Sequence, residues 1–375
     1  MKGFPICETM KAYLYLEDGE VYIGTPFGYA SSTKIGEVVF TTSMNGYPET
    51  LTDPSYKGQI LVITHPPVGN YGIPKIQKEN GIIKNFESEH ITVEGLVVSE
   101  LTNGKKWNGS KTLEEWLKEE KIPGIQGIDT RALTKKIREK GAMMGIITNK
   151  NLKKKQLEKL FKKEYSKINF VKFVSTKKTI FYKGKTNKTI VLVDFGVKHG
   201  ILEELYGLGF SIVRVPWNFT AEKILSFDPK GVVLSNGPGN PNLLENAIST
   251  TKALLEYKIP VFGICLGHQL LSLAIGGKVE KMKYGHRAIN KVVIDTLTGR
   301  GYITTHNHGY ACKKEEIEKI EGVKVWFISP DDKVVEGLIS KNFISTQFHP
   351  EARPGPNDSR FIFKIFKKMV EKNED

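Results

Sequence analysis

The chain from Lys188 onward alternates short, nearly continuous apolar runs with segments of helical pattern. The run "KTIVLVDFG" (188–196) is followed by the helix-like "KHGILEELYGLG" (198–209), and the strand-like "FSIVRVPW" (210–217) comes next. A helix–strand pair, "AEKILSFDPKGVVLS" (221–235), continues the alternation. Strands without polar alternation are expected where helices cover both faces of a sheet. Repeated β-α-β units therefore predict an α/β fold, with a parallel or mixed C-terminal sheet flanked by helices.

The first 150 residues follow a different pattern. The segment "KAYLYLEDGEVYIG" (11–24) alternates apolar and polar residues and breaks at Asp18-Gly19, which is a hairpin signal. Helical patterns come late, and one of them begins with Thr112 and Glu115 at the spacing of a capping box. We expect a β-rich mixed domain here. The chain ends in an amphipathic helical pattern, for which Asp358 is the expected N-cap.

The positive charge of the chain is concentrated in one stretch. The net charge is +14, and residues 150–188 supply +12 of it through fourteen lysines, no arginine and two glutamates. Neither an Arg-rich groove nor an aromatic RNA-binding pattern accompanies these lysines. We therefore predict a solvated Lys-rich connector (151–188) between domains at 1–150 and 189–375, and no nucleic-acid partner. A nucleic-acid binder built on this stretch is the weakest alternative.

The three cysteines indicate the compartment. Cys7, Cys265 and Cys312 are far apart, odd in number and not part of any Cys-x-x-Cys pair. This usage favours a reducing cytoplasm over a disulfide framework. No apolar stretch is long enough to span a bilayer and the first residues show no secretory signal, so no membrane association is expected.

One cysteine stands at a predicted strand-to-helix corner. In "PVFGICLGHQLL" (260–271), Cys265 follows a short strand and precedes a helical pattern, with Gly263 and Gly267 on either side. A buried cysteine is ordinarily a small apolar residue. The same spacing is also typical of a nucleophile elbow, where a helix N-terminus favours the thiolate. Cys265 and His268 could form half of a zinc site, but no second pair has suitable spacing, so we expect no metal.

Two further motifs lie in the same half of the chain. In "VVLSNGPGNP" (232–241), a strand runs into Asn-Gly-Pro-Gly and must become a loop, either a simple turn or one whose N–H groups face an oxyanion. In "STQFHPEARPGPND" (345–358), Glu351 follows His349 at a spacing that lets the carboxylate orient the imidazole. Together with Cys265, these motifs supply a nucleophile, a base, an orienting acid and oxyanion donors.

The motifs "SNGPG", "GICLGHQLL" and "QFHPEA" resemble the signature blocks of class I, triad-type glutamine amidotransferases. The segments "TTSMNGYPETLTDPSYKGQI" (41–60) and "GIQGIDTRALTKKIREKGAMMG" (124–145) resemble the N-terminal domain of carbamoyl phosphate synthase small subunits. The motifs "KMKYGH" and "THNHGYA" are also similar to that family, so the resemblance covers nearly the whole chain.

This resemblance implies roles for individual residues. Cys265 would attack the side-chain amide of L-glutamine and form a thioester, His349 would transfer the protons, and Glu351 would hold His349. The backbone N–H groups of Gly237 and Leu266 would form the oxyanion hole. The remaining implied glutamine contacts are Ser43, Gly239, Gln269, Asn307, Gly309 and Tyr310.

The resemblance also implies a partner. The segment "KGKT" (183–186) mimics the end of a phosphate-binding loop, but Thr179 stands where that loop needs glycine. We therefore expect no cofactor on this chain, with ATP and magnesium used by a large synthetase subunit that receives the ammonia. The product would serve arginine and pyrimidine biosynthesis. Alternatives are the amidotransferase subunit of an anthranilate or GMP synthase, and a binding protein that has lost hydrolysis.

One loop departs from the family pattern. After "KYGH" the family usually continues with His, Gly and a later His-Pro, whereas here residues 287–291 read Arg-Ala-Ile-Asn-Lys. We expect this departure to change details of the loop and to leave the triad intact. Histidines 286, 306 and 308 are expected to be structural or positional.

Overall fold

The computed structural model describes residues 10–104, 109–162 and 164–373. The chain divides into two compact units that do not follow chain order. The barrel unit consists of Met1–Thr41, Gly58–Lys75 and Val93–Tyr165, and the sheet unit consists of Thr42–Lys57, Ile76–Thr92 and Ser166–Asp375. The predicted limits, 1–150 and 189–375, do follow chain order. They differ from these units in two ways: two N-terminal segments group with the C-terminal half, and the predicted connector 151–188 is divided between the units after Tyr165.

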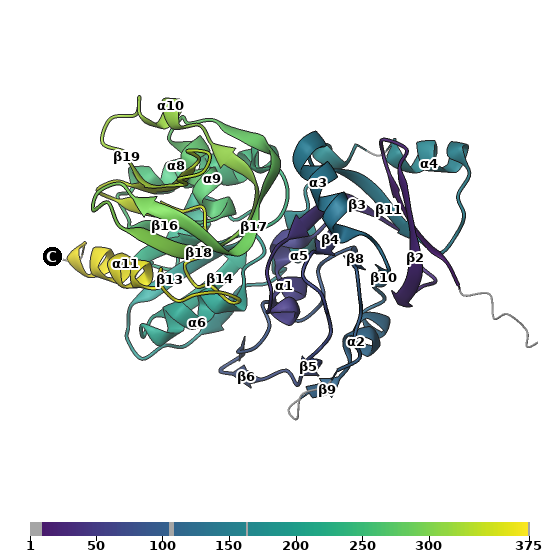
Figure 1. Ribbon diagram of the computed structural model, residues 1–375. Helices are drawn as coiled ribbons and strands as arrows, with labels where there is room; N and C mark the ends of the chain where they lie inside the picture. The colour runs from purple at the N-terminus through teal and green to yellow at the C-terminus, as the bar shows by residue number, and fades with distance from the viewer. Residues whose placement is uncertain (1–9, 105–108, 163, 374–375) are drawn as a thin grey trace, which may run out of the picture. The chain divides into compact units, whose positions relative to one another are not determined.

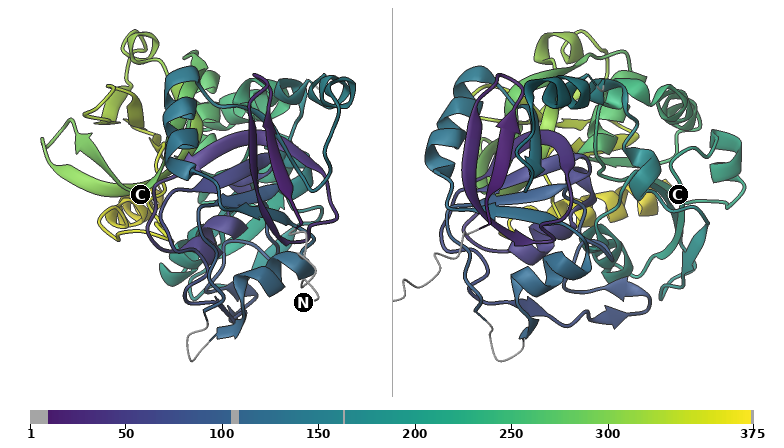
Figure 2. Two further views of the ribbon diagram at one scale, coloured as in Figure 1. Left: turned by 45° about the vertical axis from the view of Figure 1, so that its right-hand side comes forward. Right: turned by 90° about the vertical axis from the view of Figure 1, so that its right-hand side faces the viewer.

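The barrel unit is a closed β-barrel, whose strands curve around one another in Figure 2. The hairpin expected at Asp18-Gly19 is present, since β1 and β2 pair antiparallel with Tyr15 opposite Val21. Around the barrel the strands run in the order β1 (Ala12–Leu16), β11 (Met143–Thr148), β3 (Lys34–Thr41), β4 (Gln59–Ile63), β8 (Gly95–Val98), β10 (Pro123–Gln126) and β2 (Val21–Gly28).

Side-chain caps mark the start of two helices of the barrel unit. Thr112 and Glu115 form the expected capping box at the start of α2 (Leu113–Glu119), because each side chain accepts the other residue's backbone N–H. Asp129 caps α3 (Thr130–Lys140) by accepting the N–H of Ala132. A further helix, α4 (Lys154–Phe161), and the short strands β5 (Ile73–Pro74) and β9 (Gly109–Lys111) complete the unit.

The sheet unit is built on a mixed sheet, as the sequence predicts. Its centre is parallel and its edges are antiparallel. The order is β12 (Ile180–Tyr182), β14 (Ser211–Pro216), β13 (Thr189–Asp194), β15 (Gly231–Leu234), β16 (Val261–Ile264), β21 (Phe343–Thr346), β20 (Val335–Ile339), β18 (Gly301–Cys312), β17 (Val279–Asp295) and β19 (Lys324–Ile328). The strands β17 and β18 form a long antiparallel ribbon (Figure 1).

Helices cover both faces of this sheet, so its central strands are buried on both sides. Along β13, Ile190 and Leu192 pack into one apolar cluster, and Val191 and Val193 pack into the other. Full burial of each such side chain contributes roughly 1.5–3 kcal/mol to the free energy of unfolding. The first cluster includes α6 (His199–Gly207) and α11 (Phe361–Lys372), and the second includes α7 (Ala221–Leu225), α8 (Glu245–Glu256) and α9 (Leu266–Ala274).

Several short elements complete the sheet unit. From the N-terminal half come α1 (Tyr47–Thr52), β6 (Lys78–Glu79) and β7 (Ile82–Ile83), and from the C-terminal half α10 (Lys314–Ile317). The Lys-rich stretch is partly structured, because it contains α4, α5 (Val171–Val174) and the edge strand β12. None of the described helices is long and apolar enough to cross a membrane.

The expected cap of the last helix is wrong. Arg360, not Asp358, occupies the N-cap position of α11. Tight turns precede the helix, since Arg360 N–H donates to the Asn357 carbonyl at 3.1 Å and Ile362 N–H donates to the Ser359 carbonyl at 3.1 Å. These turns move the start of the helix beyond the reach of the Asp358 side chain.

Candidate active site

Cys265 occupies the sharp turn between β16 and α9 that the sequence predicts. Its backbone has φ 53° and ψ −101°, a conformation that non-glycine residues rarely adopt. The neighbouring glycines make the turn possible. A Cβ atom on Gly267 would lie 2.1 Å from the Leu234 carbonyl oxygen, and one on Gly263 would lie 2.7 Å from the Gly267 carbonyl oxygen. Strain of this kind, of order 1–3 kcal/mol, is typical of functional positions.

The Cys265 residue belongs to an apolar core cluster, but its thiol also contacts polar groups. Its side chain is only 2% exposed. Sγ lies 3.6 Å from the carbonyl oxygen of Asn307, and the side-chain amide of Gln347 donates to Sγ at 3.7 Å. The cysteine is therefore not simply one more apolar core residue.

His349 follows β21 and is held at both its backbone and its ring. Its backbone N–H donates to the Thr305 carbonyl at 2.8 Å, and Nδ1 lies 2.7 Å from Glu351 Oε1. Because a carboxylate can only accept here, Nδ1 carries a proton. Among the described residues, Nε2 has no hydrogen-bond partner although it is buried. The geometry leaves this second ring nitrogen available for proton exchange.

The electrostatics of the pair favour its charged form. Burial lowers the pKa of His349, but the Glu351 carboxylate and the interaction with Cys265 together exceed this effect and raise the pKa to about 10. Burial alone would raise the pKa of Glu351, but the charges of Lys198 and His349 lower it to about 2. Near pH 7 the pair is therefore an imidazolium and a carboxylate.

Lys198 is a site residue that sequence reasoning missed. Its ammonium group lies 3.0 Å from Glu351 Oε1 and donates to the Ala352 carbonyl at 2.7 Å, and its side chain is buried. The nearby carboxylates, Glu351 first, raise the pKa of Lys198 although burial opposes this. One signal could have found it: Lys198 lies just after β13, at the sheet edge where ligands of α/β folds bind.

Gly237 and Leu266 place two backbone N–H groups beside the cysteine turn. A Cβ atom on Gly237 would lie 2.3 Å from the Phe195 carbonyl oxygen and 2.8 Å from Leu266 Cδ2, so only glycine fits between these segments. Leu266 is the first residue of α9, where N–H groups lack intrahelical acceptors. Neither N–H donates to an acceptor within the described parts of the chain.

The other predicted contact residues form part of the same network. The side-chain amide of Gln269 donates to the Tyr310 carbonyl at 3.1 Å and to Gln347 Oε1 at 3.0 Å. Since Gln347 also contacts Cys265, the structure brings Gln269, Tyr310 and Asn307 together around the thiol.

Three of the predicted glutamine contacts, Ser43, Gly239 and Gly309, lie on chain segments that adjoin the residues around the thiol. Gly239 lies in the Gly237 loop with φ 91°. A Cβ atom on Gly309 would lie 3.2 Å from Arg287 Nη2. Ser43 is buried in the N-terminal segment Thr42–Lys57 of the sheet unit.

That N-terminal segment also supports the site through residues that sequence reasoning did not single out. Asp53 Oδ2 accepts a hydrogen bond from the Asn307 amide at 2.8 Å, and Asp53 Oδ1 accepts the Ser55 N–H at 2.9 Å. The Asn236 amide donates to Ser55 Oγ at 2.9 Å. The segment therefore fixes both the loop before Gly237 and the strand that carries Asn307.

The half zinc site considered for Cys265 and His268 is not formed. His268 Nδ1 lies 2.8 Å from Ser345 Oγ, and its Nε2 lies 3.2 Å from Cys312 Sγ. Burial lowers the pKa of His268 to about 3 and raises the pKa of Cys312 to about 12. Both groups are therefore neutral and unreactive near pH 7. Cys7 lies outside the described residues.

Comparison with known proteins identifies two families along the chain. Residues 14–147 match the family described as carbamoyl-phosphate synthase small chain, CPSase domain, and residues 191–369 match glutamine amidotransferase class-I. A solved glutamine amidotransferase from Thermotoga maritima aligns with 50% of this chain and 86% of its own, at 18% identity and a TM-score of 0.37.

Curated relatives match over nearly the whole length. Proteins named carbamoyl phosphate synthase small chain are 58% identical in Sulfurisphaera tokodaii, covering 97% of each chain, and 57% identical in Saccharolobus solfataricus, covering 97% of this chain and 98% of that protein. The Pyrococcus furiosus protein of the same name is 48% identical and covers 96% of this chain and 98% of its own. This chain therefore belongs to the carbamoyl phosphate synthase small chain family, with a class I glutamine amidotransferase domain in its second half.

Proposed function

We propose that Cys265, His349 and Glu351 hydrolyse glutamine on this chain and that the released ammonia passes to a separate synthetase subunit. The observation that carries the proposal is the arrangement of the two charged groups beside the cysteine turn. His349 is tied to Glu351 through Nδ1, its Nε2 makes no hydrogen bond among the described residues, and Cys265 is close enough to contribute to the raised pKa of the ring. This is the arrangement that a nucleophile and its proton carrier need.

The proposed reaction has two halves. The Cys265 thiolate bonds to the amide carbon of glutamine. The resulting oxyanion accepts hydrogen bonds from the backbone N–H groups of Gly237 and Leu266. Loss of one such donor typically costs about 10²–10³ in rate. His349 Nε2 then gives its proton to the departing nitrogen, which leaves as ammonia when the carbon–nitrogen bond breaks and a thioester remains.

Water completes the cycle. His349, now neutral, takes a proton from a water molecule, whose oxygen bonds to the thioester carbon. The carbon–sulfur bond breaks, the thiolate of Cys265 is restored, and glutamate leaves. Glu351 stays ionised throughout and stabilises the imidazolium, as its low pKa indicates.

Glutamine itself would be held by the polar groups around the thiol. Gln269, Asn307 and Tyr310 already share a network with Cys265, and Ser43, Gly239 and Gly309 lie on adjoining segments. In the structure Cys265 and His349 are almost completely buried. Glutamine can therefore reach Cys265 only if the segments that carry Ser43, Gly239 and Gly309 open locally.

The names of the relatives support a partner subunit. We assign ATP, Mg²⁺ and the carbamoyl phosphate chemistry to a large subunit, because the relatives are named small chains of a synthase, and we assign no cofactor to this chain. No nucleic acid or membrane takes part in this scheme. A cytoplasmic setting suits it, because a reducing compartment keeps the Cys265 thiol free. The whole-length match, which includes residues 14–147, disfavours an anthranilate or GMP synthase as the acceptor of ammonia.

The test is glutamate release from glutamine, measured with and without the large subunit. Cys265→Ala should abolish release, and Cys312→Ala is the matched control, because it removes another buried thiol from the same unit. Activity of the wild type should rise when the large subunit is added. Hydrolysis that persists in Cys265→Ala would refute the assigned nucleophile, and an unchanged rate with the partner would refute the coupling.

A further inference from the structure

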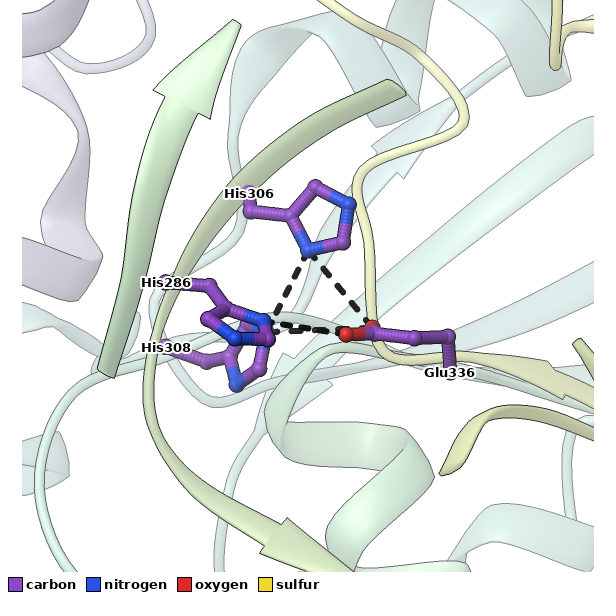
Figure 3. A group of neighbouring side chains, drawn as sticks. All are labelled: His286, His306, His308 and Glu336. Carbon is purple, nitrogen blue, oxygen red and sulfur yellow. Dashed lines mark hydrogen bonds and ion pairs between the residues drawn. The ribbon is translucent and has the colours of Figure 1, made fainter. Parts of the chain in front are cut away.

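Four buried side chains converge on one point of the long ribbon and the strand beside it. They are His286 of β17, His306 and His308 of β18, and Glu336 of β20. One potential ligand atom from each lies within 4.8 Å of all the others, and all four side chains are buried. The four side chains point toward one another (Figure 3). The proposed glutamine chemistry uses none of them.

The spacing of these atoms suits a metal ion. His306 Nδ1 and His308 Nε2 are 3.3 Å apart, and they lie 3.5 and 3.7 Å from Glu336 Oε2. His286 Nδ1 lies 3.1 Å from Glu336 Oε1. Bonds of about 2.0–2.1 Å at tetrahedral angles place neighbouring ligand atoms about 3.3–3.4 Å apart. The separations among His306, His308 and Glu336 Oε2 are close to that value, and the chosen ligand atoms of all four residues lie within 4.8 Å of one another, so a small shift of His286 would complete the set.

The outer ring nitrogens show where the protons of two histidines are. His308 Nδ1 lies 2.9 Å from the Tyr310 carbonyl oxygen, which can only accept, so this nitrogen carries the proton. His306 Nε2 lies 2.7 Å from the Thr304 hydroxyl, which already donates to the Lys291 carbonyl at 3.0 Å. That hydroxyl must therefore accept from His306 Nε2. In the neutral rings, His306 Nδ1 and His308 Nε2 then present bare lone pairs to each other.

The carboxylate adds a further unpaired acceptor at the same point. Among the described residues, Glu336 Oε2 has no hydrogen-bond partner and is fully buried. A proton on His286 Nδ1 could satisfy Oε1, while His286 Nε2 donates to Asp332 at 2.8 Å, but this leaves Oε2 and both bare nitrogens unsatisfied. Buried acceptors without a donor are costly.

We propose that His286, His306, His308 and Glu336 bind a divalent transition-metal ion, with Zn²⁺ as the best fit to three imidazoles and one carboxylate. The far nitrogen of each imidazole has an oxygen partner, at Asp332, Thr304 or Tyr310. Such partners are the outer shell that orients metal-binding histidines. Four protein ligands in a buried, closed set are typical of structural rather than catalytic zinc.

The metal would stabilise the strand that lines the candidate active site. His306 and His308 flank Asn307, whose carbonyl oxygen lies 3.6 Å from Cys265 Sγ and whose amide binds Asp53. Fixing the ribbon therefore fixes Asn307 and the neighbouring Gly309 and Tyr310. Metal loss is expected to raise KM for glutamine more than it lowers kcat. This consequence rests on the proposed function, whereas the metal site does not.

The test uses the full-length chain purified without a polyhistidine tag. After chelation and reloading with Zn²⁺, elemental analysis should find one zinc per chain, and Tm should rise with added zinc. Co²⁺ in place of Zn²⁺ should give the intense visible absorption of a four-coordinate ion. His306→Gln and Glu336→Gln should lose the zinc and the Co²⁺ absorption. His199→Gln is the control, since it removes a buried imidazole elsewhere in the sheet unit and should keep both.

The outcomes separate the two proposals. A wild-type chain that takes up no zinc after reloading, shows no Tm shift and gives no Co²⁺ absorption would overturn the metal site. Zinc binding that survives in both cluster variants would also overturn it. An unchanged KM in the zinc-free wild type would overturn the link to glutamine binding. Cys265→Ala should bind zinc normally, so failure of the glutaminase proposal would be seen independently.

Discussion

Removing the charge of Glu351 tests the electrostatic reasoning at the triad most directly. The raised pKa of His349, about 10 instead of 6.5, corresponds to roughly 5 kcal/mol of preference for the imidazolium. The Glu351 carboxylate is the main source of that preference, while burial and Lys198 oppose it. In Glu351→Gln the pKa of His349 should therefore fall below 6.5, and the ring should be neutral at pH 8.

The expected effect is a loss of the acid that protonates the departing ammonia. General acid catalysis typically contributes about 10²–10⁴ in rate, so kcat for glutamate release should fall by about that factor at pH 8. In a plot of kcat against pH, kcat should decline at alkaline pH. This alkaline limb should begin near pH 10 in the wild type and below pH 6.5 in the variant. Glutamate release measured from pH 5.5 to 10.5, with KM and kcat determined at each pH, gives both quantities.

A stability control is needed because the variant also deprives Lys198 of its partner. Leaving one buried charge uncompensated costs about 3–5 kcal/mol. Glu87→Gln makes the same chemical change at another fully buried carboxylate, which pairs with Arg353 instead of His349. It should lower the free energy of unfolding without moving the alkaline limb. An alkaline limb that stays near pH 10 in Glu351→Gln would refute the reasoning.

Three further predictions follow from the same geometry. Gly267→Ala should abolish activity and lower the yield of folded chain, because its Cβ would lie 2.1 Å from the Leu234 carbonyl oxygen; wild-type activity would contradict this. Asp53→Ala should raise KM for glutamine and cost about 1–3 kcal/mol in denaturant unfolding, because the buried amide of Asn307 loses its acceptor; an unchanged KM would count against it. The folded-state pKa of His349 is raised, so its stabilising contribution is complete below pH 6.5 and disappears as pH rises to about 10. Denaturant unfolding should show this decline in the wild type and not in the uncharged Glu351 variant.

The sequence predicts those parts of the site that depend on local pattern. Cys265, His349 and the loop before Gly237 each follow a short apolar strand, and parallel strands bring their carboxyl ends to one edge. Hydrophobic periodicity and the glycines around Cys265 were therefore sufficient to place the turn and the mixed sheet.

The parts that sequence could not predict depend on contacts between distant residues. A lysine before a helix is ordinarily solvated, and only the folded chain shows that Lys198 is buried against Glu351. His286 and Glu336 come from separate strands, so no spacing rule joins them to His306 and His308. The Asp358 cap failed for a local reason, because backbone turns beyond it set the start of the last helix.

The two N-terminal segments of the sheet unit have a consequence for the growing chain on the ribosome. The contact of Asp53 with Asn307 spans 254 residues of sequence, that of Ser55 with Asn236 spans 181, and that of Glu87 with Arg353 spans 266. Contacts between residues so far apart in sequence have a high entropic cost of loop closure, so they form late in folding. The sheet unit is therefore completed only when the C-terminal residues have emerged. A fragment that starts at residue 189 keeps the three triad residues and loses the acceptors and donors that hold the surrounding loops.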